Sequence, residues 1–245
     1  MRALRHVILP AMVLAFLIHP QVFEPLLRPL APVGGAVIYD RGSLLHLTAL
    51  HLALMLAALL PAAALAVGLA VLVTREAGAE FLPLSRALVN LGQTIPPVAV
   101  LALAVPMLGF GARPALLALF LYGMLPVFEN ALAGLRAVPA STRLAADAVG
   151  MTGARRLLSV ELPLALPLIL EGLRVSAVIS LSTATLGSTV AAASLGEVII
   201  AGLNANNLAF VVQGGVLTAC LAVMLYNLIG WCISRAMAAS RQAGI

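Results

Sequence analysis

Few residues of this chain have the types and spacings that catalysis needs. His46 and His51 are five residues apart, which suits a metal site poorly on one helix face, and no HExxH motif or cysteine–histidine cluster accompanies them. Cys220 and Cys232 share one apolar run, where twelve residues of helix would separate them by about 18 Å, too far for a disulfide. No GxxxxGKS or GxxxxGKT loop is present to bind nucleotide phosphates. The sequence therefore predicts no enzyme, no metal site and no ATP hydrolysis by this chain.

The polar chemistry of the chain is concentrated in one loop. Of its 14 basic and nine acidic residues, six lie between Arg136 and Glu161, and every basic residue is an arginine. From residue 144 the loop reads LAADAVGMTGARRLLSVELPLALP, which combines small side chains, arginines, a glycine break and a Leu-Pro step. Small side chains permit close approach and arginines supply a polar rim, which favours docking in a groove of a soluble partner. An amphipathic loop that lies on anionic lipid is the alternative.

The composition places the rest of the chain in a membrane. Of its 245 residues, 62% are hydrophobic and only 9% are charged, whereas a soluble domain carries about 25% charged residues. Such a surface cannot keep the chain in water. The net charge of +5 then indicates basic loops that face the cytoplasm rather than nucleic-acid binding.

Six apolar runs are long enough to cross a bilayer, for which about 20 residues are needed. The first run also resembles a signal peptide, but no small-x-small cleavage site follows it directly, and we expect it to be retained. The sequence thus predicts an all-α, polytopic membrane protein with about six transmembrane helices. The runs lie near residues 7–23, 45–73, 87–108, 115–135, 165–190 and 208–233.

The arginines predict the orientation of these helices. With six crossings and both termini in the cytoplasm, ten arginines lie inside and only Arg28, Arg41 and Arg113 lie outside, as the positive-inside bias requires. Arg155 and Arg156 belong to the inner set. The polar loop is therefore expected on the cytoplasmic side.

Local patterns predict how the polar loop folds. Ser141 or Thr142 can cap a short helix that runs through Val149, and Arg143 can pair with Asp147 four residues later. One face of this helix would be small or apolar, and its members are Leu144, Ala145, Ala148 and Val149.

A glycine turn and a second helix are expected to follow. Gly150 suits the left-handed residue that ends a helix. Thr152 can cap a second short helix, which has two arginines on one side and two leucines on the other. Pro163 suits the first turn of the next membrane helix. The loop is therefore expected to form a helix–glycine–helix unit beneath the membrane.

The spacing of this loop resembles the "EAA" loop of binding-protein-dependent ABC importer permeases. Ala145-Ala146 is followed by three residues, Gly150, nine residues, Val160, one residue and Leu162-Pro163. The family pattern reads Glu-Ala-Ala, three residues, Gly, nine residues, Ile, one residue and Leu-Pro. All the spacings match, and Val160 in place of Ile is a mild change.

In that family the loop is the coupling helix that sits in a cleft of the ATP-hydrolysing subunit. Leu144 stands where the family has Glu, and Asp147, one turn later, is a candidate to replace the polar contact of that Glu. The resemblance implies that coupling to the ATPase depends on Ala145, Ala146, Asp147, Gly150, Arg155, Arg156, Leu162 and Pro163.

Longer stretches resemble the osmoprotectant branch of these permeases, which imports glycine betaine, choline, carnitine and related quaternary amines. They are LGQTIPPVAVLALAVPMLGFG, YGMLPVFENALAGL and VELPLALPLILEGLRVSAVISLSTATLGSTV. The leading helix and the segment GQTIPPVAVLA are most similar to the Yeh-type glycine betaine uptake permeases. The similarity covers about residues 43–235, and AAASLGE at 191–197 departs from a stretch that is often richer in glycine.

The resemblance implies a type I ABC importer transmembrane domain in the bacterial inner membrane. Its implied partners are a second permease chain, either a sister or an identical copy, two ATP-binding subunits that bind ATP and Mg, and a periplasmic solute-binding protein. Membrane lipid surrounds it, and no nucleic acid is expected. Quaternary amines are best held by aromatic cages, but Trp231 and the three tyrosines are scattered along the chain. High-affinity recognition is therefore expected in the receptor.

Polar residues and prolines within the apolar runs are candidates to line the translocation path. Prolines free backbone groups that must find partners in neighbouring helices or water, so helix breaks are common beside a pathway. The alternative is that the hydroxyl groups bond their own helix or join neighbouring helices. The candidates are Gln93, Thr94, Pro96, Pro97, Ser180, Ser182, Thr183 and Thr185.

Other kinds of transporter stay open as alternatives. A different receptor could deliver another small solute, such as an amino acid. An ion-coupled secondary transporter usually has an ionisable residue deep in the membrane. Glu129 and Glu171 fall toward the cytoplasmic ends of their helices and Glu197 toward the outside, and Glu171 is spaced to pair with Arg174. These positions argue against ion coupling.

One membrane domain with a leading helix is the simplest organisation. We expect residues 1–42 to form that helix and an external linker, 43–235 the transmembrane domain with its coupling loop at 139–163, and 236–245 a cytoplasmic tail. Closure of the ATPase subunits would draw the docked 141–158 units together, and the fifth helix would carry the movement into the membrane through Leu162-Pro163.

Overall fold

The computed structural model describes residues 2–242, and its regular elements are helices throughout the described part. Short 3-10 segments join several of them. The helices are α1 (Arg2–Ile18), α2 (Glu24–Leu27), α3 (Leu44–Val73), α4 (Leu82–Thr94), α5 (Pro97–Leu108), α6 (Ala112–Ala137), α7 (Ala140–Ala148), α8 (Gly153–Arg156), α9 (Leu162–Ala184), α10 (Gly196–Asn204) and α11 (Leu208–Gln242). The expected tail at 236–245 continues α11 as far as Gln242, and its last three residues lie outside the described part.

Membrane-spanning length is reached in two ways. Within the described residues four helical stretches are long and apolar enough to cross a bilayer by themselves, and two bent pairs raise the number to six if each pair is one span. The first pair, 7–18 with 20–30, bends by 107°, and the second, 76–94 with 97–108, bends by 96°. The prediction of about six spans is therefore confirmed with a correction. The runs at 7–23 and 87–108 are not straight helices, because each contains a break next to a proline.

The centre of the molecule is the packing of α6 against α3 and α9. Small residues allow these helices to approach closely, as is usual where helices pack within a membrane. At Gly172 of α9, an added Cβ atom would lie only 2.7 Å from the carbonyl oxygen of Pro126 in α6. The core between the three helices includes Ala62, Ala66, Ala70, Val127, Phe128, Ala131 and Ala165.

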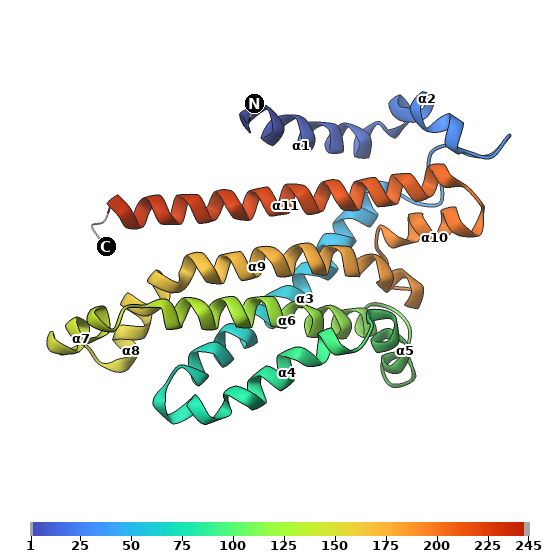
Figure 1. Cartoon of the computed structure of the whole chain (residues 1–245). Coiled ribbons are helices and arrows are strands. Elements are labelled where there is room, and N and C mark those ends of the chain that lie inside the picture. Colours follow the sequence, from blue (N-terminus) through green and yellow to red (C-terminus); the bar gives the residue numbers. More distant parts are fainter. Residues whose placement is uncertain (1, 243–245) are drawn as a thin grey trace.

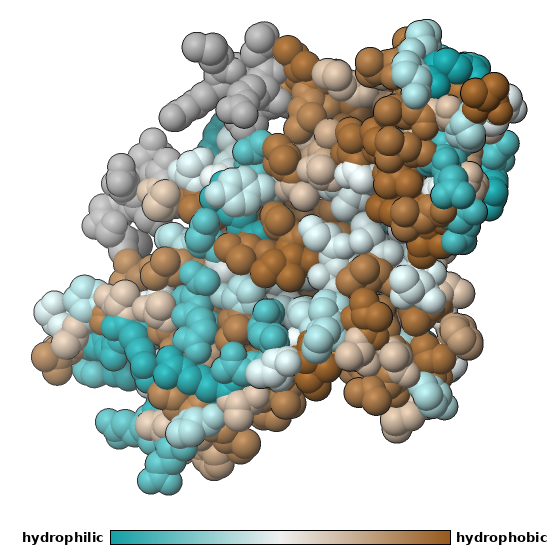
Figure 2. Space-filling view, turned by 45° about the vertical axis from the view of Figure 1, so that its right-hand side comes forward, coloured by the Kyte–Doolittle hydropathy of each residue, from teal (hydrophilic) through white to brown (hydrophobic). Residues whose placement is uncertain are grey.

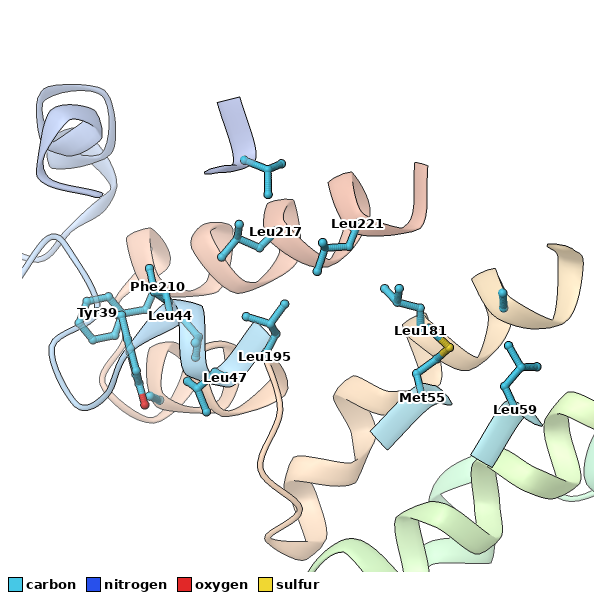
Figure 3. Close-up of a cluster of buried hydrophobic side chains, with 14 residues drawn as sticks. Tyr39, Leu44, Leu47, Met55, Leu59, Leu181, Leu195, Phe210, Leu217 and Leu221 are labelled. Atoms are coloured by element: carbon cyan, nitrogen blue, oxygen red, sulfur yellow. The ribbon is translucent and has the colours of Figure 1, made fainter. Parts of the chain in front are cut away.

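A second cluster joins α3, α9, α10 and α11 (Figure 3). Met55 and Leu59 of α3 lie in this cluster with Leu181 of α9. The linker before α3 is held over α11 by buried Gln213, which donates to the carbonyl oxygen of Val37 at 2.8 Å and accepts from the backbone N–H of Tyr39 at 3.1 Å. This cluster packs the first half of α3 against α9, α10 and α11.

The polar loop and both described chain ends lie at one end of the molecule. Figure 1 shows the start of α1, the end of α11 and the pair α7–α8 on the same side, with α2, α5 and α10 at the opposite side. In Figure 2, hydrophilic surface gathers at the lower left and the upper right edge, and mostly hydrophobic or neutral surface lies between. This arrangement is expected of a protein whose middle is in lipid.

Candidate functional site

Helix α7 is the first half of the polar loop. It begins at Ala140 with Pro139 at the N-cap, and no side chain caps it. The predicted cap by Ser141 or Thr142 is therefore wrong. Proline has a fixed φ and no backbone N–H, and the helix begins directly after Pro139. Ser141 and Thr142 therefore lie within the first helical turn and not at the N-cap position.

The end of α7 matches the prediction. Gly150 has φ of +77°, in the left-handed region, and its N–H donates to the carbonyl oxygen of Asp147 at 2.9 Å. The N–H of Met151 donates to the carbonyl oxygen of Ala146 at 3.1 Å, and these two bonds form a Schellman cap. An added Cβ on Gly150 would meet nothing within 4 Å. Glycine is therefore required here for its backbone conformation and not for space.

The second half of the loop differs in part from the prediction. Thr152 caps α8 as expected, since its Oγ1 accepts from the backbone N–H of Arg155 at 3.3 Å. However, no non-helical segment separates α8 from the membrane helix α9. A π-helical turn at Leu157–Glu161 connects it to α9, so the stretch Gly153–Val190 forms one long helical span. Pro163 lies in the first turn of α9, as predicted, and its missing N–H favours such an irregular turn.

One face of α7 is apolar and exposed. Leu144 and Val149 are 69% and 74% exposed, and Ala145 and Ala148 are exposed beside them. Ala146, in contrast, is buried against the rest of the protein. The predicted face of four residues is confirmed, and the two neighbouring alanines of the motif point in different directions.

The charged residues of the loop pair differently from the prediction. Arg143 donates to the carbonyl oxygen of Leu135 in α6 at 2.8 Å, and Asp147 forms its ion pair with Arg156 instead. The expected Arg143–Asp147 pair is therefore wrong. An ion pair within one helix is worth only about 0.2–0.5 kcal/mol, so a better placed partner on another element replaces it easily. Arg155 is exposed.

Glu161 is a residue of this site that the sequence did not single out. Its side chain is 1% exposed and forms ion pairs with Arg156 and with Arg75, which follows α3. The Nε atom of Arg156 lies 2.9 Å from its Oε1 atom. No pattern in the sequence joins Glu161 to an arginine 86 residues earlier, and only the packing of α3 beside the loop brings them together.

The break between α4 and α5 contains half of the candidate path residues. Gln93, Thr94 and Pro96 are exposed, and the backbone is extended at Ile95 and Pro96 before α5 begins at Pro97. Gln93 donates from Nε2 to the carbonyl oxygen of Tyr122 at 3.1 Å, and Thr94 donates to the carbonyl oxygen of Leu91 at 3.0 Å.

Two further contacts hold this break against α6. The hydroxyl of Tyr122 donates to the carbonyl oxygen of Ile95, which lies in the extended segment. At Gly92, an added Cβ would lie 2.4 Å from the carbonyl oxygen of Leu121, so only glycine permits this approach. The bend is therefore set by contacts with α6 as well as by its prolines.

The hydroxyl residues of α9 lie in two environments. Ser180 is fully buried, and an added Cβ on Gly123 of α6 would lie 3.5 Å from its hydroxyl, so it faces the α6–α9 interface. Ser182 is exposed and Thr183 is half-buried. Thr185 donates to the carbonyl oxygen of Ser182 at 2.7 Å. Ser182 and Thr183 therefore stay the more open path candidates on this helix.

His51 has a role that the sequence did not predict. At the end of α9 the N–H of Thr185 turns to the carbonyl oxygens of Ser182 and Thr183, because a 3-10 segment begins there, and it does not bond Leu181 as a continuing α-helix would. The Nε2 atom of fully buried His51 lies 3.0 Å from the carbonyl oxygen of Leu181. A carbonyl oxygen only accepts hydrogen bonds, so Nε2 is the donor.

Among residues 2–242 no three His, Cys, Asp or Glu side chains are grouped to hold a metal ion.

The acidic residues of the long helices form ion pairs. Glu171 pairs with Arg174 at 3.1 Å, as the spacing predicts, and the Arg174 guanidinium also lies over the ring of Tyr226. Glu129 of α6 pairs with Arg86 of α4 at 3.0 Å. These contacts join α9 to α11 and α4 to α6, which is a structural role.

Comparisons with known proteins agree with this architecture. The family described as "Binding-protein-dependent transport system inner membrane component" matches residues 66–241. The chain is 39% identical over 188 residues to the osmoprotectant import permease protein OsmY of Salmonella typhimurium, covering 77% of this chain and 80% of that protein. It is 36% identical over 187 residues to the glycine betaine/carnitine/choline transport system permease protein OpuCB of Bacillus subtilis, covering 75% and 84%.

Solved structures share the fold. A chain of the MetNI methionine ABC transporter in an inward-facing conformation aligns with a TM-score of 0.65, covering 80% of this chain and 95% of that one, at 22% identity. A chain of an amino acid ABC transporter determined with histidines aligns with a TM-score of 0.64, covering 78% and 92%, at 18% identity. At such low identity these two structures establish the fold alone.

Proposed function

The chain belongs to the family of binding-protein-dependent transport system inner membrane components, and we propose that its importer takes up a compatible solute such as glycine betaine, choline or carnitine. It is a permease subunit of an ABC importer and not a catalytic subunit. The observation that carries the choice of solute is the identity of 36–39% over three quarters of the chain with permeases named for osmoprotectants and these quaternary amines.

The exposed face of α7 is the proposed contact with a separate ATP-binding subunit. Leu144, Ala145, Ala148 and Val149 form an apolar surface, with exposed Arg155 nearby on α8. Apolar side chains surrounded by charged ones are suited to a protein partner, because the centre gains from burial while the rim stays polar. The partner subunit, and not this chain, would bind ATP and Mg.

The complete importer would contain a receptor, two permease chains, either identical or sisters, and two ATP-binding subunits. A periplasmic solute-binding protein delivers the solute, this chain and a second permease chain form the path, and two ATP-binding subunits drive it. We place α7 and both termini in the cytoplasm. The location of α7–α8 and the described chain ends on one side of the molecule, together with the excess of arginines in those segments, supports this orientation.

The path itself needs no high-affinity site in this chain. Exposed polar residues at the α4–α5 break and on the outer part of α9 are uncharged, namely Gln93, Thr94 and Ser182, and exposed apolar residues such as Ile95 and Val98 lie beside the break. A weakly polar lining can pass a cation without retaining it, whereas an aromatic cage would hold it. Recognition therefore belongs to the receptor.

Transport by the full complex tests this proposal. The permease, its ATP-binding subunit, its receptor and any sister permease are reconstituted in proteoliposomes, and uptake of radiolabelled glycine betaine, choline, carnitine, methionine and histidine is measured with and without ATP. We expect ATP-dependent uptake of one or more of the three quaternary amines. Uptake of an amino acid alone would overturn the choice of solute.

A control separates this function from ion coupling. Vesicles that contain the permease alone are given a proton gradient and no ATP. Solute accumulation under those conditions would contradict the ABC mechanism, whereas its absence alongside ATP-driven uptake by the full complex supports it.

A further inference from the structure

Glu161 is a buried charged residue whose two oxygens are both engaged. Its side chain is 1% exposed, Oε1 accepts from Nε of Arg156 at 2.9 Å, and Oε2 accepts from Nη2 of Arg75. A charge so far from water is costly unless it is paired and hydrogen-bonded, and removing one partner of such a pair leaves the other uncompensated. Burial with two arginine partners therefore makes Glu161 sensitive to any separation of the elements that carry those arginines.

The partners of Glu161 come from the coupling loop and from a helix that is distant in sequence. Arg75 lies two residues beyond α3, and its N–H still donates to the carbonyl oxygen of Leu72 in that helix at 3.1 Å. Arg156 ends α8 and also pairs with Asp147 of α7. Four charged residues thus form a continuous network from α7 through α8 and the π turn to α3.

The π turn explains why Arg156 and Glu161 meet. In an α-helix, side chains five residues apart point about 140° away from each other. In the turn Leu157–Glu161 the helix closes with i to i+5 bonds, and the N–H of Leu162 donates to the carbonyl oxygen of Leu157. Residues five apart are thereby brought to a similar side of the helix. The irregular turn places the carboxylate of Glu161 between the two arginines.

We propose that Glu161 is a positioning residue for coupling, which links α3 to the coupling loop so that α3 and α9 move together. The proposal rests on the function proposed above. Through the chain alone, the loop is connected to α6 before Ala140 and to α9 after Glu161. The contact between Glu161 and Arg75 adds α3, whose first half, from Leu44 to Leu59, shares a buried cluster with residues of α9 and α11. Movement of α7 would then be transmitted across the membrane by α3 as well as by α9.

Substitution of Glu161 in the complete importer tests this role. The Glu161→Gln variant keeps the size of the side chain and removes its charge. We expect assembly with the ATP-binding subunit and ATP hydrolysis to persist, while solute taken up per ATP falls by about two- to thirty-fold, the range found for residues that transmit coupling without touching a ligand. The matched control is Glu129→Gln, which removes the exposed ion pair to Arg86 between α4 and α6, and should leave the ratio unchanged.

A second variant keeps the proposal testable if Glu161→Gln does not fold. Arg75→Gln removes the other partner of the ion pair, and this side chain is 29% exposed whereas Glu161 is 1% exposed. It should also lower the amount of solute taken up per ATP. If both act through one contact, the double variant should be no worse than the more severe single variant. Normal uptake per ATP in either folded single variant would overturn the proposal, as would an equal loss in Glu129→Gln.

The wild-type complex separates this proposal from the choice of solute. If it transports a solute other than a quaternary amine, the ratio is measured with that solute, and a fall in Glu161→Gln still supports the role of Glu161. If the wild-type chain supports transport without any ATP-binding subunit, the coupling role is overturned together with the proposed function.

Discussion

Gly150 is required in its turn for its backbone conformation alone. Its φ of +77° lies in a region that costs other residues about 1–2 kcal/mol, and no neighbouring atom limits the size of its side chain. The turn that it makes sets the angle between α7 and α8. A change here should therefore alter the orientation of the proposed coupling surface without disturbing the transmembrane core.

We expect Gly150→Val to uncouple ATP hydrolysis from uptake. The β-branched side chain disfavours the left-handed conformation, so α7 would no longer be oriented to meet the proposed ATP-binding subunit. The measurement is uptake per ATP hydrolysed by the reconstituted complex, together with the amount of permease inserted in the membrane.

Gly153→Val is the matched control for this prediction. Gly153 is also exposed and also has open space around its Cβ position, but its backbone does not need a positive φ. It should retain coupling. Normal coupling in Gly150→Val would show that the glycine turn has no part in transmission.

The α4–α5 pair is the element whose shape most needs explanation. Its bend of 96° occurs at Ile95 and Pro96, where the helical bonding is interrupted. In a continuous helix the carbonyl of Ile95 would accept from the N–H of Ala99, which here donates to Pro96 instead. The hydroxyl of Tyr122 supplies the missing partner from α6. The break is thus stabilised from outside the pair.

Removal of that hydroxyl should loosen the bend. Tyr122→Phe loses one hydrogen bond, worth about 0.5–1.5 kcal/mol, and leaves the Ile95 carbonyl without this donor. We expect a lower thermal midpoint in detergent and faster maleimide labelling of Thr94→Cys, measured in a chain in which Cys220 and Cys232 are replaced by alanine.

Tyr226→Phe provides the comparison, because Tyr226 contacts Arg174 through its ring and its backbone carbonyl. Its hydroxyl should be dispensable, so labelling at residue 94 should not change. Equal labelling rates in Tyr122→Phe and the parent chain would contradict the proposed support of the bend.

The whole molecule has its polar ends on opposite sides of an apolar middle (Figures 1 and 2). The cost of moving charged loops into hydrocarbon fixes this orientation once the protein is inserted. Helix α7 lies at one end, and the turn between α10 and α11 lies at the other. The two ends should therefore be accessible from different sides of the membrane.

Single cysteines can verify this orientation. Ser141 in α7 and Asn206 before α11 are both exposed. In spheroplasts that carry an otherwise cysteine-free chain, a membrane-impermeant maleimide should label Asn206→Cys at once and Ser141→Cys only after lysis. The opposite pattern would exclude a cytoplasmic coupling surface on α7.

The sequence by itself determined the features that depend on residues close together in the chain. The apolar runs fixed a helical membrane protein, and the spacing around Gly150, Thr152 and Pro163 predicted the turn, the cap and the first turn of α9. The turn, the cap and the first turn of α9 are each decided within four or five residues, and the same is true of the Glu171–Arg174 pair.

Only the tertiary structure decided which distant groups meet. Glu161 joins Arg75 across 86 residues, His51 meets Leu181 across 130, and Tyr122 meets Ile95 across 27. The local prediction of an Arg143–Asp147 pair was wrong, because the packing of α8 beside α7 lets Asp147 pair with Arg156. A buried polar group needs a hydrogen-bond partner. The packing of the helices determines which groups lie close enough to be that partner.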